Sequence, residues 1–462
     1  MSSDDGLFLK TYPDVAAAID LLEHWLAQYV ENNRLPGLSI GIVYDQTLVW
    51  AKGFGYADLK SQTPATSLTL YRIASHTKMF TATAIMQLRD AGKLGLDDPV
   101  RAYLPWFGIR YRDDQPGDRS DITIRQLLSH TSGLPRDATI PVWTDDIFPA
   151  WQAIMATTPE REAAYLTDQK RKYSNLAYTL AGAVVEAASG QDYATYIREH
   201  ILDPLDMLHT RVLPEADTPG LATGYMRPDA QGLRPEAGYT DVQGFRAAAS
   251  IASNVEDMAR FVSFQFRDEP PEANPVLRGG TVREMHRPQW IDPDWATSYG
   301  LGLSLRRIDD WSIAGHSGGL KGYLTQTAWC RDQKFGVIAL INALSSIPQE
   351  VVDRTFRMIA PRLLAAVKGP EPQADPEWQA YVGTYHNVWG DDQFVTIEAN
   401  QVRIVALDWI GDPPTILAPI PGERHTFRAV EGGAAGERVV FEVDAHGQVT
   451  RMYVAGEYYD RV

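Results

Sequence analysis

The apolar pattern of the chain changes twice along its length, and these changes limit the folds that it can adopt. Runs typical of strands lie near the start, at 38–44 and 48–55, and return later at 299–305, 323–330 and 335–341. From about residue 97 to residue 267 the pattern is mainly helical, with long loops. Helical runs at 14–33, 75–91 and 349–366 flank the strand-like runs. We therefore predict an α+β fold, in which helices flank an antiparallel sheet and an all-helical region is inserted between its strands.

A Pro-rich segment, 369–376, follows this region. Beyond it, short apolar runs such as 394–397, 402–407 and 439–443 are separated by turn sequences. Runs of this length and spacing are typical of small barrels and sandwiches. We predict a first domain over 1–368, a linker over 369–376 and a small all-β domain over 377–462.

The chain of 462 residues is acidic, with 59 Asp and Glu against 43 Lys and Arg and a net charge of −16. This balance argues against nucleic acid or an anionic membrane as a partner, because both require a basic face. The first residues lack the basic start and apolar stretch of a signal peptide, and no later run approaches ~18 apolar residues. We expect a cytoplasmic protein that does not span a membrane.

Neither metal chemistry nor cysteine chemistry has a clear signal in the sequence. The ten histidines are scattered, without the i, i+4 spacing of a helical zinc site. The single cysteine, Cys330, lies beside an apolar run, which favours a buried structural thiol over a nucleophile. We expect no metal and no cofactor.

The strongest local signal is Ser75-His76-Thr77-Lys78, placed where a strand-like run turns into a helix. Residues at i and i+3 share a helix face, so the Lys78 amine can reach the Ser75 hydroxyl. A desolvated, neutral amine can take the proton of a serine nucleophile, and the helix N-terminus offers N–H groups to an oxyanion. A helix N-cap with an exposed lysine is the alternative, but the apolar Met79-Phe80 that follows favours a buried Lys78.

Tyr173-Ser174-Asn175 precedes a second helical run and is the next candidate. Tyr173 could move a proton beside Ser75, and Asn175 could bind a substrate carbonyl or orient Lys78. A buried tyrosine and a helix cap are the structural alternative.

The third candidate is Gly315-His316-Ser317-Gly318-Gly319, ahead of a strand-like run. Gly318 and Gly319 allow close backbone approach, so an edge strand here could supply an oxyanion N–H and bind an extended acyl chain. A tight glycine turn with a structural histidine is one alternative. Another is the G-x-S-x-G nucleophile elbow, with Ser317 as the nucleophile, but the elbow requires a helix after the serine.

Taken together, these motifs resemble those of the serine β-lactamase and penicillin-binding-protein superfamily, specifically its class C-like branch. That branch groups class C β-lactamases, DD-peptidases, D-aminopeptidases and β-lactamase-like carboxylesterases. The resemblance covers about residues 15–365 and is supported by the phrases at 53–57, 96–100, 127–135 and 299–302. We interpret His130, within the third phrase, as part of a structural turn. The segment around 381–385 resembles the lipocalin-like accessory domains of some members, which implies a β-barrel.

The resemblance implies a role for each candidate. Ser75 would be the acylated nucleophile, Lys78 its activating partner, and Tyr173 the general base and the acid for the leaving group. Asn175 would contact substrate, and the N–H groups of Ser75 and Gly319 would form the oxyanion hole. His316 stands where β-lactamases usually have a lysine, and a mostly neutral imidazole weakens recognition of a carboxylate.

We therefore predict a serine hydrolase of small esters, amides or short peptides, of carboxylesterase or D-amino-acid peptidase type. A β-lactamase or DD-carboxypeptidase is an alternative, although such enzymes meet their substrates outside the cytoplasm. A catalytically vestigial ligand-binding protein is another. We expect loops near Trp143, Tyr239, Phe245 and Trp295 to shape an aromatic acyl pocket. The β domain is expected to cover the site or to associate with another subunit in a homo-oligomer.

Overall fold

The structure is a computed structural model, and it describes residues 11–112, 121–138, 143, 145–268, 276–344, 348–369, 374–407 and 413–462. The chain divides into two compact units, Met1–Leu364 and Ala365–Val462. Most of the expected linker, residues 370–373, lies outside the described residues. The domain limits expected from the sequence remain a prediction.

The first unit is built on one antiparallel sheet, as the sequence predicts. Among the described residues it has nine strands in the order β3-β2-β1-β11-β10-β9-β8-β7-β6. The strands are β1 Gly37–Tyr44, β2 Thr47–Asp58, β3 Thr63–Pro64, β6 Trp290–Ile291, β7 Thr297–Tyr299, β8 Ser304–Ile308, β9 Trp311–Leu320, β10 Tyr323–Cys330 and β11 Phe335–Ile341. β1 pairs with β11, from Leu38 opposite Ile341 to Tyr44 opposite Phe335. Strands from the two ends of the first unit therefore pair inside the sheet.

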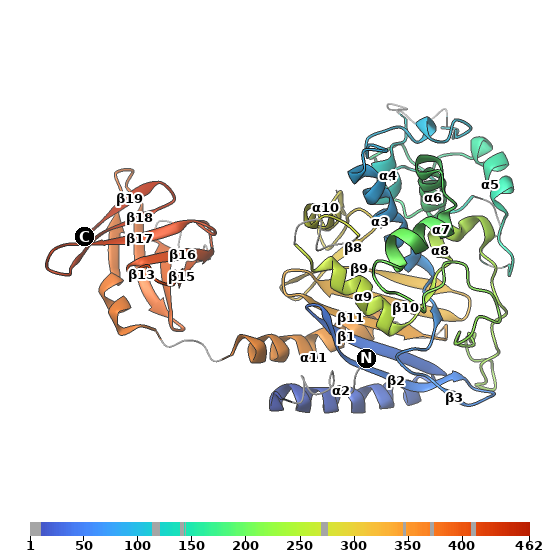
Figure 1. Ribbon diagram of the computed structural model, residues 1–462, viewed down its shortest axis with the longest axis horizontal. Coiled ribbons are helices and arrows are strands. Elements are labelled where there is room, and N and C mark those ends of the chain that lie inside the picture. Colours follow the sequence, from blue (N-terminus) through green and yellow to red (C-terminus); the bar gives the residue numbers. More distant parts are fainter. Residues whose placement is uncertain are drawn as a thin grey trace. The chain divides into compact units, whose positions relative to one another are not determined.

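Both faces of this sheet are covered, which explains why β11 is buried along its whole length. Helix α2 (Pro13–Asn32) contacts β2, and helix α11 (Pro348–Lys368) packs Phe356 against Phe335 of β11, with 5.0 Å between ring centroids. Helix α9 (Val255–Gln265) contacts β1, β2 and β11, and it lies on the opposite side of the sheet from α2 (Figure 1).

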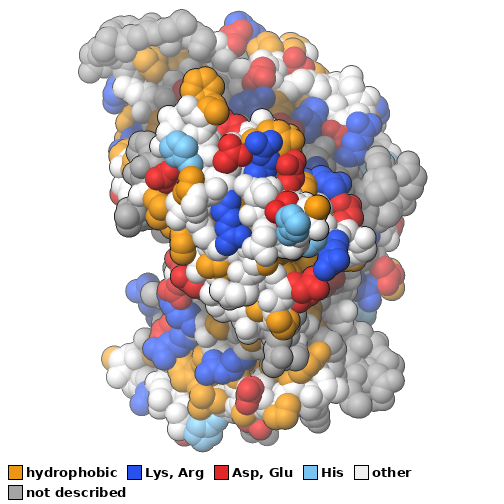
Figure 2. Space-filling view, turned by 90° about the vertical axis from the view of Figure 1, so that its left-hand side faces the viewer, with side chains coloured by type: hydrophobic (Ala, Val, Ile, Leu, Met, Phe, Trp, Pro, Cys, Tyr) orange, Lys and Arg blue, Asp and Glu red, His pale blue; other side chains and the backbone are white. Residues whose placement is uncertain are grey.

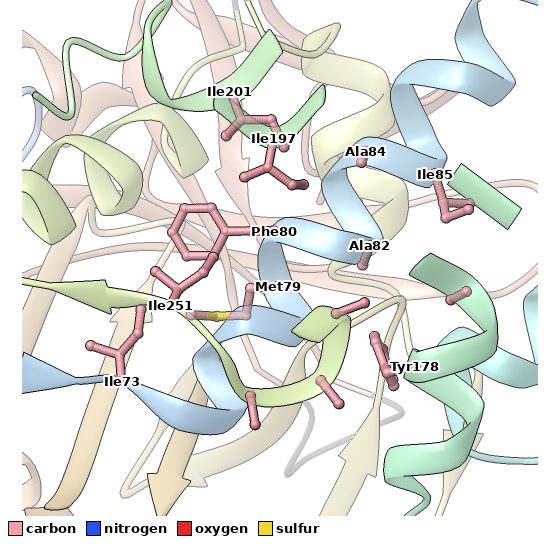
Figure 3. Packing of buried hydrophobic residues seen from close by; sticks show 14 of the residues in the cluster. Ile73, Met79, Phe80, Ala82, Ala84, Ile85, Tyr178, Ile197, Ile201 and Ile251 are labelled. Atoms are coloured by element: carbon pink, nitrogen blue, oxygen red, sulfur yellow. The ribbon is translucent and has the colours of Figure 1, made fainter. Parts of the chain in front are cut away.

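The helical region surrounds helix α3 (Thr77–Asp90), which follows a single 3-10 turn, Ala74–His76. The other helices here are α4 Ile124–Ser129, α5 Trp151–Thr157, α6 Asn175–Ser189, α7 Tyr193–Ile197, α8 Arg246–Ala249 and α10 Gly279–Met285. Every residue from Thr77 to Met86 is buried, because α3 is enclosed by α6, α7 and α8. Figure 3 shows Met79 and Phe80 of α3 among apolar residues of other segments, including Ile73, Ile197, Ile201 and Ile251.

The second unit contains a closed antiparallel barrel of eight strands within the described residues, which confirms the expected barrel. The strands are β12 Gly383–His386, β13 Asp392–Glu398, β14 Gln401–Ala406, β15 Thr415–Pro419, β16 Thr426–Glu431, β17 Arg438–Val443, β18 Val449–Val454 and β19 Glu457–Arg461. β12 pairs with β19 and closes the barrel. Its interior is filled by apolar side chains such as Tyr385, Val395 and Phe441.

Of the helices within the described ranges, none is long and apolar enough to cross a membrane. In the same part of the chain, no group of three or more His, Cys, Asp and Glu side chains is placed to hold a metal ion. Acidic and basic side chains are intermixed on the face shown in Figure 2. Cys330 is buried, and burial raises the pKa of its thiol, so it is poorly suited to act as a nucleophile.

Candidate active site

Ser75 lies in the 3-10 turn that leads into α3. The residue before it, Ala74, has a left-handed φ of +48°, a conformation that is costly for a residue with a Cβ. The turn is held by a hydrogen bond from the His76 N–H to the Ile73 carbonyl, at 3.1 Å. Ser75 stays partly exposed while both its neighbours in the turn are buried. Its hydroxyl is therefore presented to solvent from a rigid, strained turn.

Lys78 is fully buried and contacts Ser75 from the first turn of α3. Its Nζ lies 3.0 Å from Ser75 Oγ and donates a hydrogen bond to the Ala248 carbonyl at 2.9 Å. Burial lowers the pKa of Lys78 well below its usual value; Asp137 opposes this shift and Arg136 adds to it. The expectation of a buried Lys78 is confirmed, and the direction of the pKa shift favours the neutral amine.

Tyr173 approaches Ser75 from a segment 98 residues away in sequence. Its phenol donates a hydrogen bond to Ser75 Oγ at 2.8 Å. Burial raises the pKa of Tyr173 well above its usual value, although the hydrogen bond to Ser75 partly opposes the shift. The Ser174 hydroxyl caps α6 by accepting from the Ala177 N–H at 3.0 Å. Tyr173 is thereby fixed just before a helix start, with its phenol protonated.

Asn175 follows in the first position of α6 and is almost completely buried. Its amide nitrogen donates to the Asp137 carboxylate at 2.8 Å, and its Oδ1 has no partner among the described residues. Asp137 also accepts a hydrogen bond from the Trp143 indole at 2.9 Å. Asn175 therefore stands beside the carboxylate that acts on the Lys78 amine, and a direct role in binding substrate remains a prediction.

The third motif forms part of strand β9. β9 pairs with β8 only as far as Gly315, whereas it pairs with β10 up to Leu320. A Cβ on Gly318 would lie 2.2 Å from the Ile73 carbonyl oxygen, so a glycine is required for β9 to pass the turn that carries Ser75. A Cβ on Gly319 would meet only Leu324 Cδ2, at 3.5 Å. The end of β9 thus lies beside the Ser75 turn with no strand on its other edge, among the residues that the structure describes.

His316 uses both ring nitrogens in contacts within the protein. Nε2 lies 3.1 Å from the Tyr299 hydroxyl and Nδ1 lies 2.6 Å from the Ser317 carbonyl. Burial lowers the pKa of His316 to about 3, with smaller contributions in the same direction from Lys78 and His76. The imidazole is therefore neutral and provides no permanent positive charge for a substrate carboxylate.

Ser317 lies in the middle of β9 and is followed by strand rather than helix. A nucleophile elbow needs a sharp turn from strand to helix at the serine. The elbow hypothesis is therefore wrong for this segment.

His130 lies in a structural turn, as the sequence predicts, but it also packs against Tyr173 of the candidate site. His130 does end α4 in a left-handed conformation, with φ +62°. It also accepts a hydrogen bond from the Ser174 N–H through Nδ1 at 3.2 Å, and its ring packs 4.5 Å from the ring of Tyr173. Burial lowers its pKa well below the usual value. The only sequence signal was the histidine itself directly after a short helix, which does not reveal that it packs on Tyr173.

The four aromatic residues expected to shape an acyl pocket are not brought together. Trp143 bonds to Asp137 near the site, but Phe245 is fully buried. Tyr239 and Trp295 line two separate cavities. These four side chains therefore do not line one common pocket, because an aromatic residue in a loop sequence does not reveal which way it faces.

The chain is similar in sequence to curated proteins and in fold to solved structures. The chain is 29% identical over 341 residues to "Protein flp" of Staphylococcus aureus (strain MW2), which covers 72% of this chain and 64% of that protein. The chain thus spans less than two thirds of the length of that curated relative. A solved octameric penicillin-binding protein homologue from Pyrococcus abyssi has a TM-score of 0.64 at 24% identity, covering 96% of this chain and 99% of that one. A D-stereospecific amidohydrolase from Streptomyces sp. has a TM-score of 0.59 at 23% identity, covering 71% and 96%.

These two structural likenesses, at such low identity, show the fold alone. The family evidence is the match of residues 22–361 to the family model described as "Beta-lactamase". This match spans well over half of the chain and contains Ser75, Lys78, Tyr173 and the end of β9. The protein belongs to the β-lactamase-like family of serine hydrolases.

Proposed function

We propose that this protein hydrolyses small esters or amides through an acyl-enzyme on Ser75. The observation that carries the proposal is the position of Ser75 Oγ, 3.0 Å from the Lys78 amine and 2.8 Å from the Tyr173 phenol. A serine hydroxyl becomes a useful nucleophile when an adjacent base takes its proton. A neutral Lys78 amine has a lone pair that can accept this proton, and the Tyr173 phenol has a proton that it can transfer.

The directions of the pKa shifts support one role for each of these two groups. The neutral Lys78 amine accepts the Ser75 proton as Oγ bonds to the substrate carbonyl carbon. The carbonyl oxygen becomes an oxyanion, which the backbone N–H groups of Ser75 and Gly319 would stabilise. Tyr173, protonated at rest, gives its proton to the leaving alcohol or amine as the carbonyl–leaving group bond breaks. The acyl-enzyme then stands beside a Tyr173 phenolate and a Lys78 ammonium.

The second half of the cycle restores both groups. The Tyr173 phenolate accepts a proton from water as the water oxygen bonds to the acyl carbon. The ester bond to Ser75 breaks, and the Lys78 ammonium returns its proton to Oγ. The product leaves as a carboxylic acid, and the enzyme regains a neutral amine and a protonated phenol.

The neutral His316 bears on the choice of substrate. Because it offers no permanent cation, the site favours substrates without a carboxylate at that position. We therefore propose short-chain esters and D-amino-acid amides as the first substrates to test; one solved protein that shares the fold is a D-stereospecific amidohydrolase. β-Lactam or cell-wall peptide hydrolysis is the second candidate, supported by the family match.

The decisive experiment is intact-mass labelling of the full chain with a fluorophosphonate. We expect one adduct, located on Ser75, which is absent in Ser75→Ala and present in Ser317→Ala. Ser317 is a matched control because it is an exposed serine on the neighbouring strand. If Ser75→Ala is labelled as fast as the parent, the proposal fails. If the parent is not labelled at all, the vestigial ligand-binding alternative is favoured.

Labelling would be followed by a substrate panel of p-nitrophenyl esters, D- and L-amino-acid p-nitroanilides and a chromogenic cephalosporin. Fast ester or D-amide turnover with slow cephalosporin turnover is the expected result. The reverse order would favour the β-lactamase candidate.

A further inference from the structure

The cavity that Trp295 lines has a volume of about 490 Å³. Its lining does not include any residue of the candidate active site. Part of its lining is one row of cross-strand neighbours, with Ser298 of β7 opposite Leu305 of β8 and Leu305 opposite Ala314 of β9. Cavities of this size suit a small-molecule ligand. We refer to it below as the β7–β9 pocket.

The β7–β9 pocket is strongly basic, although the chain as a whole carries a net charge of −16. The residues that line it include one acidic residue, Asp332, and five arginines, Arg283, Arg287, Arg306, Arg307 and Arg331. Clustered like charges repel one another and are costly unless counter-charges or an anionic ligand offset them.

Protein carboxylates offset only some of these charges. Arg306 forms a forked ion pair with Asp353, and Arg283 and Arg331 share Asp268. Two arginines remain, Arg287 and Arg307. The Arg307 guanidinium donates a hydrogen bond to the Asp310 backbone carbonyl at 3.1 Å.

Arg287 and Arg307 pair with no carboxylate among the described residues. The buried Nε of Arg331 also lacks a hydrogen-bond partner there. The pocket therefore retains donor capacity that the described protein groups leave unused, and guanidinium groups bind carboxylates and phosphates with matched, forked geometry.

Apolar surface lies beside these charges. Trp295 is 81% exposed and Ile291 is 44% exposed, and both line the pocket. The Trp295 backbone is left-handed, with φ +57°, and its N–H donates to the Asp292 carbonyl at 2.8 Å. Asp292 is itself anchored by Arg171, whose Nε lies 2.9 Å from Asp292 Oδ1. The indole is thus held on a tied loop, where it is available to pack against the apolar part of a ligand.

We propose that the β7–β9 pocket is a binding site for a small anionic amphiphile. Its carboxylate or phosphate would lie on Arg287 and Arg307, and its apolar or aromatic body would cover Trp295 and Leu305. The proposal does not depend on the reaction proposed for Ser75.

Isothermal titration calorimetry of the full chain tests it with three probes that share a phenyl body. These are 4-phenylbutyrate, phenyl phosphate and the neutral 4-phenyl-1-butanol. We expect saturable binding of one or both anions, and the stronger of the two identifies the preferred head group. Arg287→Ala combined with Arg307→Ala should weaken that binding at least about tenfold, as loss of charge-assisted hydrogen bonds would. Trp295→Ala should weaken it as well.

Arg354→Ala is the control, because Arg354 lies outside the pocket, over the half-buried Trp25 ring at 5.1 Å from its centroid. The Arg354→Ala variant should bind the two anions with the same affinity as the parent. Thermal unfolding of each variant checks that the fold is intact. The proposal is overturned if the double variant binds the anions as tightly as the parent. Equal binding of the neutral alcohol, or no saturable binding of either anion up to about 10 mM, would also overturn it.

Discussion

The Asn175 amide donates a hydrogen bond to the Asp137 carboxylate, with 2.8 Å between Nδ2 and Oδ1. The side chain of Asp137 is only 13% exposed, whereas that of its neighbour Arg136 is 61% exposed. The negative charge of Asp137 raises the pKa of Lys78 against the effect of burial, and the positive charge of Arg136 lowers it. Two consecutive residues therefore act with opposite sign on the amine that contacts Ser75.

Replacing Asp137 by Asn should move the acid limb of the pH profile to lower pH. Without the carboxylate the pKa of Lys78 falls further, so the amine stays neutral, and able to act as a base, in more acidic solution. The amide keeps an acceptor for Asn175, although it satisfies Trp143 less well. The measurement is the rate of fluorophosphonate acylation, or kcat/KM for an ester, from pH 4 to pH 9.

Arg136→Gln is the control of opposite sign for this experiment. Removing the guanidinium lets the pKa of Lys78 rise, so the acid limb of this variant's pH–rate profile should move to higher pH. Shifts of both variants in the same direction would show that Lys78 is not the group that titrates.

Replacing Lys78 by Met should abolish most of the acylation while the fold is retained. An apolar side chain of similar length replaces the buried amine, so the packing around α3 changes little. Loss of a general base typically costs about 10²–10⁴ in rate. Lys78→Arg should be equally inactive, because a guanidinium does not give up its proton. Fluorophosphonate kinetics and thermal unfolding are measured together; acylation of Lys78→Met at the parent rate would eliminate the base role.

Gly318→Ala should inactivate the protein, whereas Gly319→Ala should not. The new Cβ at 318 would lie 2.2 Å from the Ile73 carbonyl oxygen and 2.3 Å from Thr325 Oγ1, so the turn that carries Ser75 must shift. The Cβ at 319 would make an ordinary contact, and the substitution keeps the backbone N–H proposed for the oxyanion hole. Misplacement of reacting groups by about 1 Å can cost about 10² in rate. Acylation rates of the two variants decide the matter, and similar losses in both would contradict this explanation.

The sequence predicted the features that depend on local periodicity or short spacing. The i, i+3 spacing of Ser75 and Lys78 sufficed to predict their contact, since the 3-10 turn that holds Ser75 runs directly into α3. Strand-like runs at both ends of the first unit predicted a sheet that joins them, and the pairing of β1 with β11 confirms it. The barrel followed from its short, regularly spaced runs.

Contacts that depend on where loops return were not predictable in the same way. Asp137 meets Asn175 across 38 residues of sequence, and neither its burial nor its effect on Lys78 has a periodic signature. His130 has a local signal that indicates a helix end, which hides its packing on Tyr173. The loop near Trp295 was expected to shape the acyl pocket. Asp292 of this loop is bound by Arg171, and Trp295 lines the β7–β9 pocket instead.

Acid should destabilise the folded protein between about pH 6.5 and pH 4, and His286 should account for part of the loss. Its Nε2 accepts a hydrogen bond from the Trp329 indole at 2.8 Å, so protonation there breaks the contact. Burial lowers the pKa of His286 to about 4, against 6.5 for the exposed group. The unfolded chain therefore binds the proton first, and the free energy of unfolding falls as the pH drops through this window.

His286→Gln should flatten that dependence, because the glutamine Oε1 can accept from Trp329 without titrating. The difference in slope should approach about 1.4 kcal/mol per pH unit below pH 6, and its sum should not exceed about 3 kcal/mol. Urea unfolding at pH 7, 6 and 5, followed by tryptophan fluorescence, measures it. His446→Gln, at an exposed turn of the barrel, should keep the slope of the parent. If the free energy of unfolding of the parent and of His286→Gln has the same dependence on pH, then the pKa of His286 does not differ between the folded and the unfolded chain. That result would contradict the prediction.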